Sequence, residues 1–242
     1  MRKKKRYRTT LLDWIYPRRC AFCDELLDGT ERYLCHSCQK QIPKPIGEPR
    51  CKRCGKPLHA ETAEYCTDCV RQEPSFTRGM GLFVYEDPWK TSLMGLKFKG
   101  RKEYGIFLGK IMALYGKEFL LQTQVQVILP VPIHRKKKSV RGYNQAEVLA
   151  QEISRGFSIP IRTDLVLRKK STKAQKELSR KERKKNMEQA FFVKKEVSHY
   201  QRVLLVDDIY TTGSTANAIA AKLKQAGVKE VFVLTLCIGK GF

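Results

Sequence analysis

The segment VLLVDDIYTTGST, residues 203–215, decides the fold class of the chain. It opens with four uninterrupted apolar residues, which is typical of a short strand buried on both faces of a parallel sheet. Two carboxylates, Asp207 and Asp208, stand at the expected end of that strand. A short run of hydroxyl residues and glycine follows, and residues 216–226 then show the apolar spacing of a helix that ends at Gly227. The segment therefore predicts a strand, a loop and a helix, in the order found in α/β proteins.

The loop between this strand and this helix has the composition of a phosphate-binding site. Backbone N–H groups at a helix start are unpaired, and the helix dipole favours an anion beside them. A glycine lets the backbone approach the anion closely, and hydroxyl groups add donors. The loop residues are Thr211, Thr212, Gly213, Ser214 and Thr215. An ordinary helix cap is the alternative interpretation, but a cap needs one side chain rather than a whole loop of them.

The two aspartates indicate what kind of phosphate is bound. Asp207 and Asp208 would repel a bare phosphate, so their position favours a ligand that also carries hydroxyl groups, or a magnesium ion that bridges acids and phosphates. A ribose 5-phosphate offers both features, with its phosphate in the loop and its hydroxyl groups on the acids. We therefore expect a sugar-phosphate site with Asp207 and Asp208 as its candidate catalytic residues.

The same segment resembles the phosphoribosyl diphosphate (PRPP) motif of type I phosphoribosyltransferases. The shared pattern is four apolar residues, two acids, two apolar residues and the hydroxyl loop, and Tyr210 departs from the aliphatic residue usual at its position. The resemblance implies PRPP as the ligand, Mg²⁺ as its metal, and a parallel sheet flanked by helices as the fold.

The charge of the chain points to a polyanionic partner. Its 242 residues include 48 Lys and Arg against 24 Asp and Glu, which gives a net charge of +24. Nucleic acid is the commonest partner of so basic a protein, and an anionic membrane surface is less suited because the basic runs lack a paired apolar helix face. No apolar run is long enough for a transmembrane segment or a signal peptide, so we expect a cytoplasmic protein.

Eight of the nine cysteines form an internal repeat of CxxC pairs in the first third of the chain. The first set is Cys20, Cys23, Cys35 and Cys38, and the second set, 31 residues later, is Cys51, Cys54, Cys66 and Cys69. Each set provides four thiolates for a tetrahedral zinc and leaves no open position for chemistry, so we expect two structural zinc sites. Disulfides are the alternative, and a reducing cytoplasm disfavours them. The spacing permits either sequential or cross-brace ligation, and we favour sequential ligation because each repeat holds a complete ligand set.

Each cysteine repeat is too short to fold by burial alone, and metal binding of about 10–16 kcal/mol per site would supply the missing stability. We therefore expect two domains, a double zinc ribbon over residues 1–75 and a phosphoribosyltransferase-like α/β domain over residues 76–242. The expected strands are residues 80–85, 125–131, 165–167, 190–193, 203–206 and 231–238, and the expected helices are residues 89–98, 104–121, 144–155 and 216–226.

A basic loop over residues 132–145 is expected at the carboxyl edge of the sheet. Its cations Arg135, Lys136 and Arg141 are candidates to bind a diphosphate group or DNA. The alternative is a solvated basic turn before a helix capped by Asn144.

A second basic segment covers residues 168–185, in which ten of eighteen residues are Lys or Arg. It is too polar to pack, and it begins with the candidate ligand-binding residues Arg168 and Lys169. Closure over a diphosphate and binding of DNA phosphates are equally compatible with this composition, and an inert charged surface is the third interpretation.

Over nearly its whole length the chain resembles the ComF (ComFC-type) competence family. The resemblance rests on the cysteine repeats ahead of the PRPP motif and on three further stretches: LLDWIYPRRC at residues 11–20, RGYNQAEVLA at 141–150 and QKELSRKERKKNMEQAF at 175–191. It implies a cytoplasmic protein needed for natural transformation that handles incoming single-stranded DNA. It also implies a competence helicase or another DNA-transport protein as a partner.

Three functions fit these features. The one we favour is a DNA-handling protein whose phosphoribosyltransferase-like domain binds PRPP or a DNA phosphate. The second is an active Mg²⁺-dependent phosphoribosyltransferase for a nucleobase, and the third is a PRPP-sensing adaptor without turnover. The sequence shows no hood for base recognition, so enzymatic activity is left open. Five aromatic residues are candidates to stack on bases, although packing explains most of them equally well: Tyr7, Phe22, Tyr33, Tyr65 and Tyr143.

Overall fold

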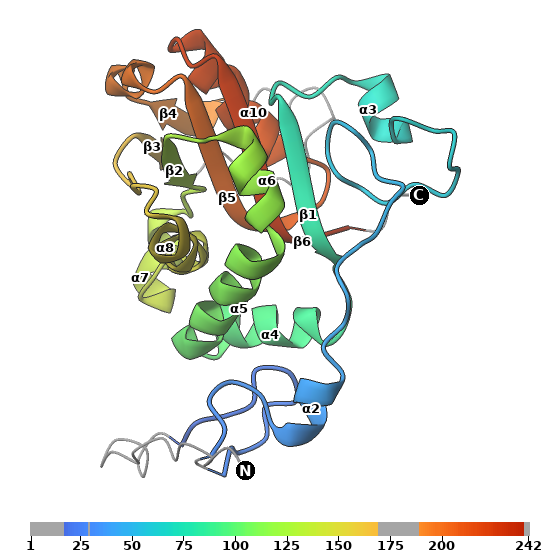
Figure 1. Ribbon diagram of the computed structural model, residues 1–242. Helices are drawn as coiled ribbons and strands as arrows, with labels where there is room; N and C mark the ends of the chain where they lie inside the picture. The colour runs from blue at the N-terminus through green and yellow to red at the C-terminus, as the bar shows by residue number, and fades with distance from the viewer. Residues whose placement is uncertain (1–16, 29, 169–188, 240–242) are drawn as a thin grey trace, which may run out of the picture.

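A four-stranded parallel sheet lies at the centre of the computed structural model, which describes residues 17–28, 30–168 and 189–239. The strand order is β1-β6-β5-β2, and each neighbouring pair is parallel (Figure 1). The strands are β1 (Arg78–Val84), β2 (Val127–Pro130), β5 (Arg202–Tyr210) and β6 (Glu230–Ile238). The predicted fold class is confirmed in its architecture, a parallel sheet flanked by helices.

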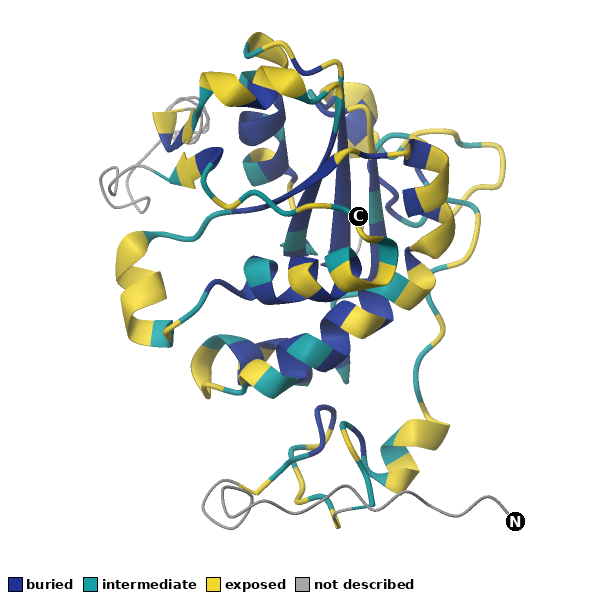
Figure 2. Cartoon of the chain, turned by 60° about the vertical axis from the view of Figure 1, so that its left-hand side comes forward, coloured by how far each residue is buried: buried dark blue, intermediate teal, exposed yellow. Residues whose placement is uncertain are grey.

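The two faces of the sheet are covered by different layers, which explains the uninterrupted apolar strands. Leu204 and Val206 of β5 pack with the layer made by α4 (Trp89–Phe98), α5 (Lys102–Tyr115) and α8 (Gln145–Phe157). Val203 and Leu205 face the other side and pack with α10 (Ser214–Gln225). Figure 2 shows the strands as the buried centre of the molecule between these layers.

Strand β5 is longer than the sequence predicts. The apolar run ends at Val206, but β5 continues through both aspartates to Tyr210, because β6 pairs with it throughout. Asp207 lies opposite Thr235 and Tyr210 lies opposite Ile238 in this register. The acids therefore belong to the strand itself and not to the loop after it.

Two helical segments also differ from the prediction. The helix expected over residues 104–121 is divided at Gly116 into α5 and α6 (Lys117–Thr123). The basic loop expected over residues 132–145 contains a helix, α7 (Arg135–Arg141), which begins where His134 Nδ1 accepts a hydrogen bond from the Lys136 N–H at 3.2 Å. It ends at Gly142, whose φ of 82° is the left-handed value common after helices.

A small antiparallel sheet joins the ends of the basic insert. Strands β3 (Val166–Arg168) and β4 (Phe191–Val193) pair in register, and a 3₁₀ helix, η2 (Lys195–His199), follows. Both short strands were predicted. Most of the basic segment between them, including Lys169, lies outside the described residues.

The two cysteine repeats fold alike. The first has a bridge between Arg19 and Leu26 and a short helix, α2 (His36–Lys40), and the second has a bridge between Arg50 and Pro57 and a short helix, α3 (Thr67–Arg71). Figure 1 shows them apart, with α2 beneath α4 and α3 beside the start of β1. Each ribbon packs into a different hydrophobic cluster of the α/β domain.

Candidate functional site

The two aspartates of β5 face opposite sides of the sheet because consecutive strand residues alternate. Asp208 is only 4% exposed and points toward the layer of α4 and α8, whereas Asp207 is half-buried. The two carboxylates therefore have different neighbours and are available to a ligand to different degrees.

Asp208 is held by a network that joins four elements. Lys97 of α4 forms an ion pair with its Oδ2, and Gln145 Nε2 of α8 donates a hydrogen bond to its Oδ1 at 3.1 Å. Arg141 Nη1, at the end of α7, donates to Gln145 Oε1. A buried carboxylate requires such partners, and this one is fixed in place before any ligand arrives.

Asp207 is the less constrained of the two acids. Its Oδ1 accepts a hydrogen bond from the Asp208 backbone N–H at 2.9 Å. Limited access of water and the neighbouring Asp208 carboxylate raise the pKa of Asp207 above its usual range. Burial lowers the pKa of Arg168, and the charge of Asp207 partly opposes that shift. Arg168 therefore lies within the electrostatic reach of Asp207.

The hydroxyl loop after β5 adopts a conformation that requires its glycine. Gly213 has a φ of 72°, which residues with a side chain rarely adopt, and α10 begins at the next residue. The Thr212 and Ser214 hydroxyl oxygens lie 2.8 Å apart. Thr211, Thr212 and Ser214 are exposed, and Thr215 is half-buried. The loop thus presents hydroxyl groups to solvent beside the first N–H groups of a helix.

Tyr210 connects this loop to the second zinc ribbon. A Cβ at Gly213 would overlap the Tyr210 hydroxyl and lie 2.5 Å from its Cζ, so the ring fills the space beneath the glycine. The ring also makes a T-shaped contact with Phe76, with a centroid distance of 6.1 Å, in a cluster that includes Cys54 and Cys69. Burial raises the pKa of Tyr210 above its usual range. The residue that departs from the PRPP motif is therefore a contact between the loop and the ribbon.

The predicted basic residues are divided by the structure. Arg141 joins the Asp208 network, and Arg168 lies near Asp207. Arg135 and Lys136 lie on the exposed surface of α7. Lys169 is outside the described residues, so its predicted role stays a prediction.

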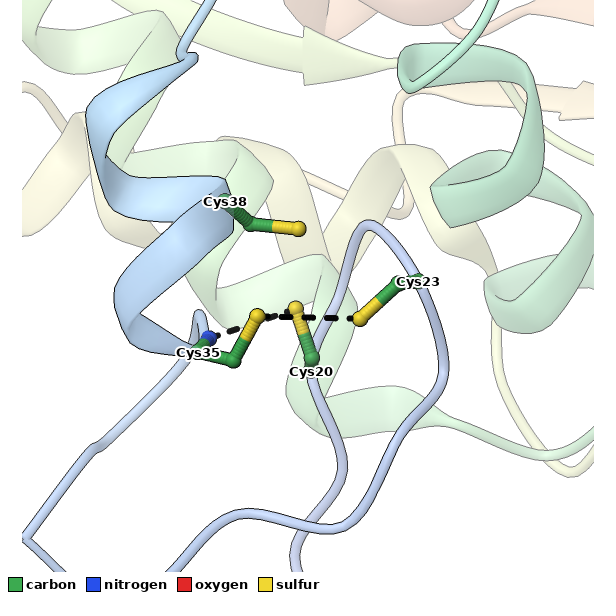
Figure 3. A group of neighbouring side chains, drawn as sticks. All are labelled: Cys20, Cys23, Cys35 and Cys38. Atoms are coloured by element: carbon green, nitrogen blue, oxygen red, sulfur yellow. Dashed lines mark hydrogen bonds between the residues drawn. The ribbon is translucent and has the colours of Figure 1, made fainter.

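Each cysteine set gathers its own four sulfurs, which lie within 4.8 Å of one another. Figure 3 shows the first set converging from α2 and the turn at Cys20. The Sγ atoms of Cys23 and Cys35 are 3.7 Å apart, and those of Cys54 and Cys66 are 3.6 Å apart. Tetrahedral zinc with Zn–S bonds of about 2.3 Å needs sulfurs about 3.8 Å apart, so both sets fit zinc. The grouping is sequential, as favoured from the sequence.

The first zinc ribbon packs against α4, the helix that carries Lys97. Phe22 packs edge-on against Trp89 of α4 and Phe107 of α5, with centroid distances of 5.0 and 5.7 Å. Asp24 accepts a hydrogen bond from Lys99 Nζ at 2.9 Å, just after the end of α4. Phe22 is buried by these contacts, which excludes it as a base-stacking residue.

Comparison with known proteins agrees with both halves of the structure. Residues 11–70 match the double zinc ribbon domain family, and residues 144–241 match the phosphoribosyl transferase domain family. Competence protein F of Haemophilus influenzae is 36% identical over 220 residues, which cover 89% of this chain and 94% of that protein. The chain belongs to the ComF competence family. Among other ComF relatives, competence protein ComFC of Streptococcus pneumoniae is 31% identical, with 87% of this chain and 90% of the relative covered. DNA utilization protein YhgH of Escherichia coli K12 is also 31% identical, with 77% and 83% covered.

Two residues of this ComF site were not predicted from the sequence. Lys97 and Gln145 hold Asp208, yet they lie more than sixty residues from it along the chain. Gln145 was included only as the end of the basic loop, and Lys97 was one lysine among many.

Within the described residues, no helix is both long and apolar enough to cross a membrane.

Proposed function

We propose that this ComF protein binds a sugar phosphate at the carboxyl end of β5 and uses that site to handle single-stranded DNA in the cytoplasm during natural transformation. The ligand is PRPP with Mg²⁺, or a phosphate of the DNA itself. One observation supports the proposal most strongly. At the carboxyl edge of the sheet, the two acids of β5 are followed directly by a hydroxyl loop whose glycine, Gly213, has a left-handed backbone conformation.

The residues divide the binding task. Thr211 to Thr215 and the first N–H groups of α10 would hold the phosphate. Asp207, half-buried and free of an ion pair with the described residues, would accept hydrogen bonds from sugar hydroxyl groups or bind Mg²⁺. Asp208, already held by Lys97 and Gln145, would shape the acid pair. Oxygen donors of this kind suit Mg²⁺, which would neutralise part of the charge of a diphosphate.

The DNA-handling part of the proposal rests on charge and family. The net charge of +24 and the exposed cations of α7 favour a polyanion, and the relatives carry the names competence protein and DNA utilization protein. The proposal also includes two domains, a zinc-ribbon domain over residues 1–75 and a transferase-like domain over residues 76–242. It further includes a DNA-transport protein as a partner. Transfer of a ribosyl group with Asp207 and Asp208 as catalytic residues is the second candidate, favoured only by the acids.

Calorimetric titration with Mg²⁺ and PRPP, with and without single-stranded DNA, tests this function. We expect PRPP to bind the wild-type protein and to bind Asp207→Ala at least about tenfold more weakly, since hydrogen bonds to a charged group are lost. Glu61→Ala, at an exposed acid of the second ribbon, is the matched control. Competition between PRPP and DNA would show one shared site. Equal affinity of the two variants would contradict the proposal, and release of diphosphate with a panel of bases would promote the transferase.

A further inference from the structure

Phe98, the last residue of α4, exposes 69% of its surface. This is more than any other aromatic residue exposes in the described part of the chain. Other aromatic residues near the site are packed: Trp89 and Tyr210 are buried, and Tyr143 is partly buried. Phe98 therefore offers a large exposed aromatic surface, whereas the other aromatic residues near the site are packed.

The position of Phe98 is set by the acid site. The preceding residue, Lys97, forms the ion pair with Asp208. The carbonyl of Leu96 accepts a hydrogen bond from the Tyr143 hydroxyl at 2.5 Å, which ties the end of α4 to the segment before α8. The backbone at the end of α4 is thus held in place, and Phe98 follows directly after the lysine that pairs with Asp208.

One side of the ring already carries a cation. The guanidinium carbon of Arg141 lies 5.7 Å from the centroid of Phe98, and the same guanidinium donates to Gln145, which binds Asp208. An aromatic ring beside an arginine is the usual means by which proteins stack unpaired bases without choosing among them. The exposed fraction of the ring leaves room for one such base.

The charge around Phe98 indicates which kind of molecule binds to its exposed ring. The exposed residues of α7, the helix that ends at Arg141, include Arg135 and Lys136, and an apolar protein partner that covered this helix would have to desolvate these cations. A nucleic acid strand would instead neutralise them with its phosphates. Charge complementarity therefore favours a strand over an apolar protein surface.

We propose that Phe98, with Arg141 behind it, is a stacking platform for an unpaired nucleobase of the strand whose sugar phosphate lies against Asp207 and the Gly213 loop. The proposal rests on the proposed function and adds the ligand's base to it. Because every base has a π face, the platform binds bases with little sequence preference. It also provides the base contact for which the sequence shows no hood.

The test compares ligands with and without a base. Titrations of wild type, Phe98→Ala and Phe98→Trp use PRPP, which has no base, and a short thymidine oligonucleotide that carries one 2-aminopurine. We expect Phe98→Ala to weaken oligonucleotide binding about 5- to 150-fold and to abolish the quenching of 2-aminopurine fluorescence. Phe98→Trp should retain both, and PRPP affinity should stay within about twofold in all three. Leu114→Ala, at a residue 64% exposed on α5, is the control and should change nothing.

The outcomes separate this proposal from the proposed function. Oligonucleotide affinity and quenching that survive Phe98→Ala would overturn the platform while PRPP binding upheld the sugar-phosphate site. If the wild-type protein does not bind PRPP, the sugar-phosphate site is contradicted. Quenching of 2-aminopurine that depends on Phe98 would still support the platform in that case. A wild-type protein that does not bind the oligonucleotide would overturn the platform. Self-association that Phe98→Ala abolishes, measured by sedimentation, would assign the ring to a protein interface and also overturn it.

Discussion

Replacing Gly213 by alanine should damage the phosphate loop in two separable ways. The φ of 72° would be imposed on a residue with a Cβ, which costs about 1–2 kcal/mol. The new Cβ would also overlap the Tyr210 hydroxyl and lie 2.5 Å from its Cζ. Because Tyr210 is buried against Phe76, its ring cannot simply move away, and overpacking of this kind costs about 1–3 kcal/mol.

A double-mutant cycle isolates the second cost. In a Tyr210→Ile background the ring is gone, so Gly213→Ala should cost only the backbone strain, about 1–2 kcal/mol. The coupling free energy between the two positions is then about 1–3 kcal/mol, well above the error of such cycles. Urea unfolding of the four proteins with bound zinc measures it, and PRPP titration reports the loop directly. Additive losses, with a coupling below about 0.5 kcal/mol, would refute the view that Tyr210 supports the loop.

Three further perturbations test the rest of the site. Lys97→Met should lower the free energy of unfolding by about 3–5 kcal/mol, because it leaves the buried Asp208 without its cation. In urea unfolding, adding Asp208→Asn should recover most of that loss. A double variant no more stable than Lys97→Met would contradict the pairing of Lys97 with Asp208. The folded-state pKa of Asp207 lies above its unfolded value, so ionisation of Asp207 opposes folding and stability falls as the pH rises through the folded-state pKa. Asp207→Asn should therefore raise the Tm at neutral pH. The same variant should weaken PRPP binding about tenfold or more. A lower Tm at neutral pH would show that the charge stabilises the fold. Cys54→Ser should reduce PRPP affinity more than Cys23→Ser does, since Cys54 packs in the Tyr210 cluster and Cys23 is exposed on the other ribbon; calorimetry of both, with equal losses as the contrary result, decides this.

The sequence predicted the elements whose burial is periodic. Helix α4 has the predicted bounds, and β1, β2, β6 and α10 lie within a few residues of theirs. It could not predict the length of β5, because the extension past Val206 depends on pairing with β6. It also missed α7, where a net positive charge suggested a loop although Lys and Arg are good helix formers and His134 and Gly142 delimit the helix.

The site was predictable only where its residues are consecutive. The acids and the hydroxyl loop follow one another in one segment, so local chemistry identifies them. Lys97 and Gln145 reach the site from other elements, and tertiary packing alone brings them there. The cysteine ligands were predictable because each ribbon is nearly self-contained, whereas the separate docking of the two ribbons depends on Phe22 and Tyr210, which carry no metal-binding signal.

A crystal structure with Mg²⁺ and PRPP is the most direct test of the central claim, that the carboxyl end of β5 binds a sugar phosphate. We expect the 5-phosphate to lie against the N–H groups from Gly213 to Thr215, with the ribose hydroxyl groups within hydrogen-bond distance of Asp207. A loop filled by its own side chains, with PRPP bound at a zinc ribbon or elsewhere on the surface, would contradict it.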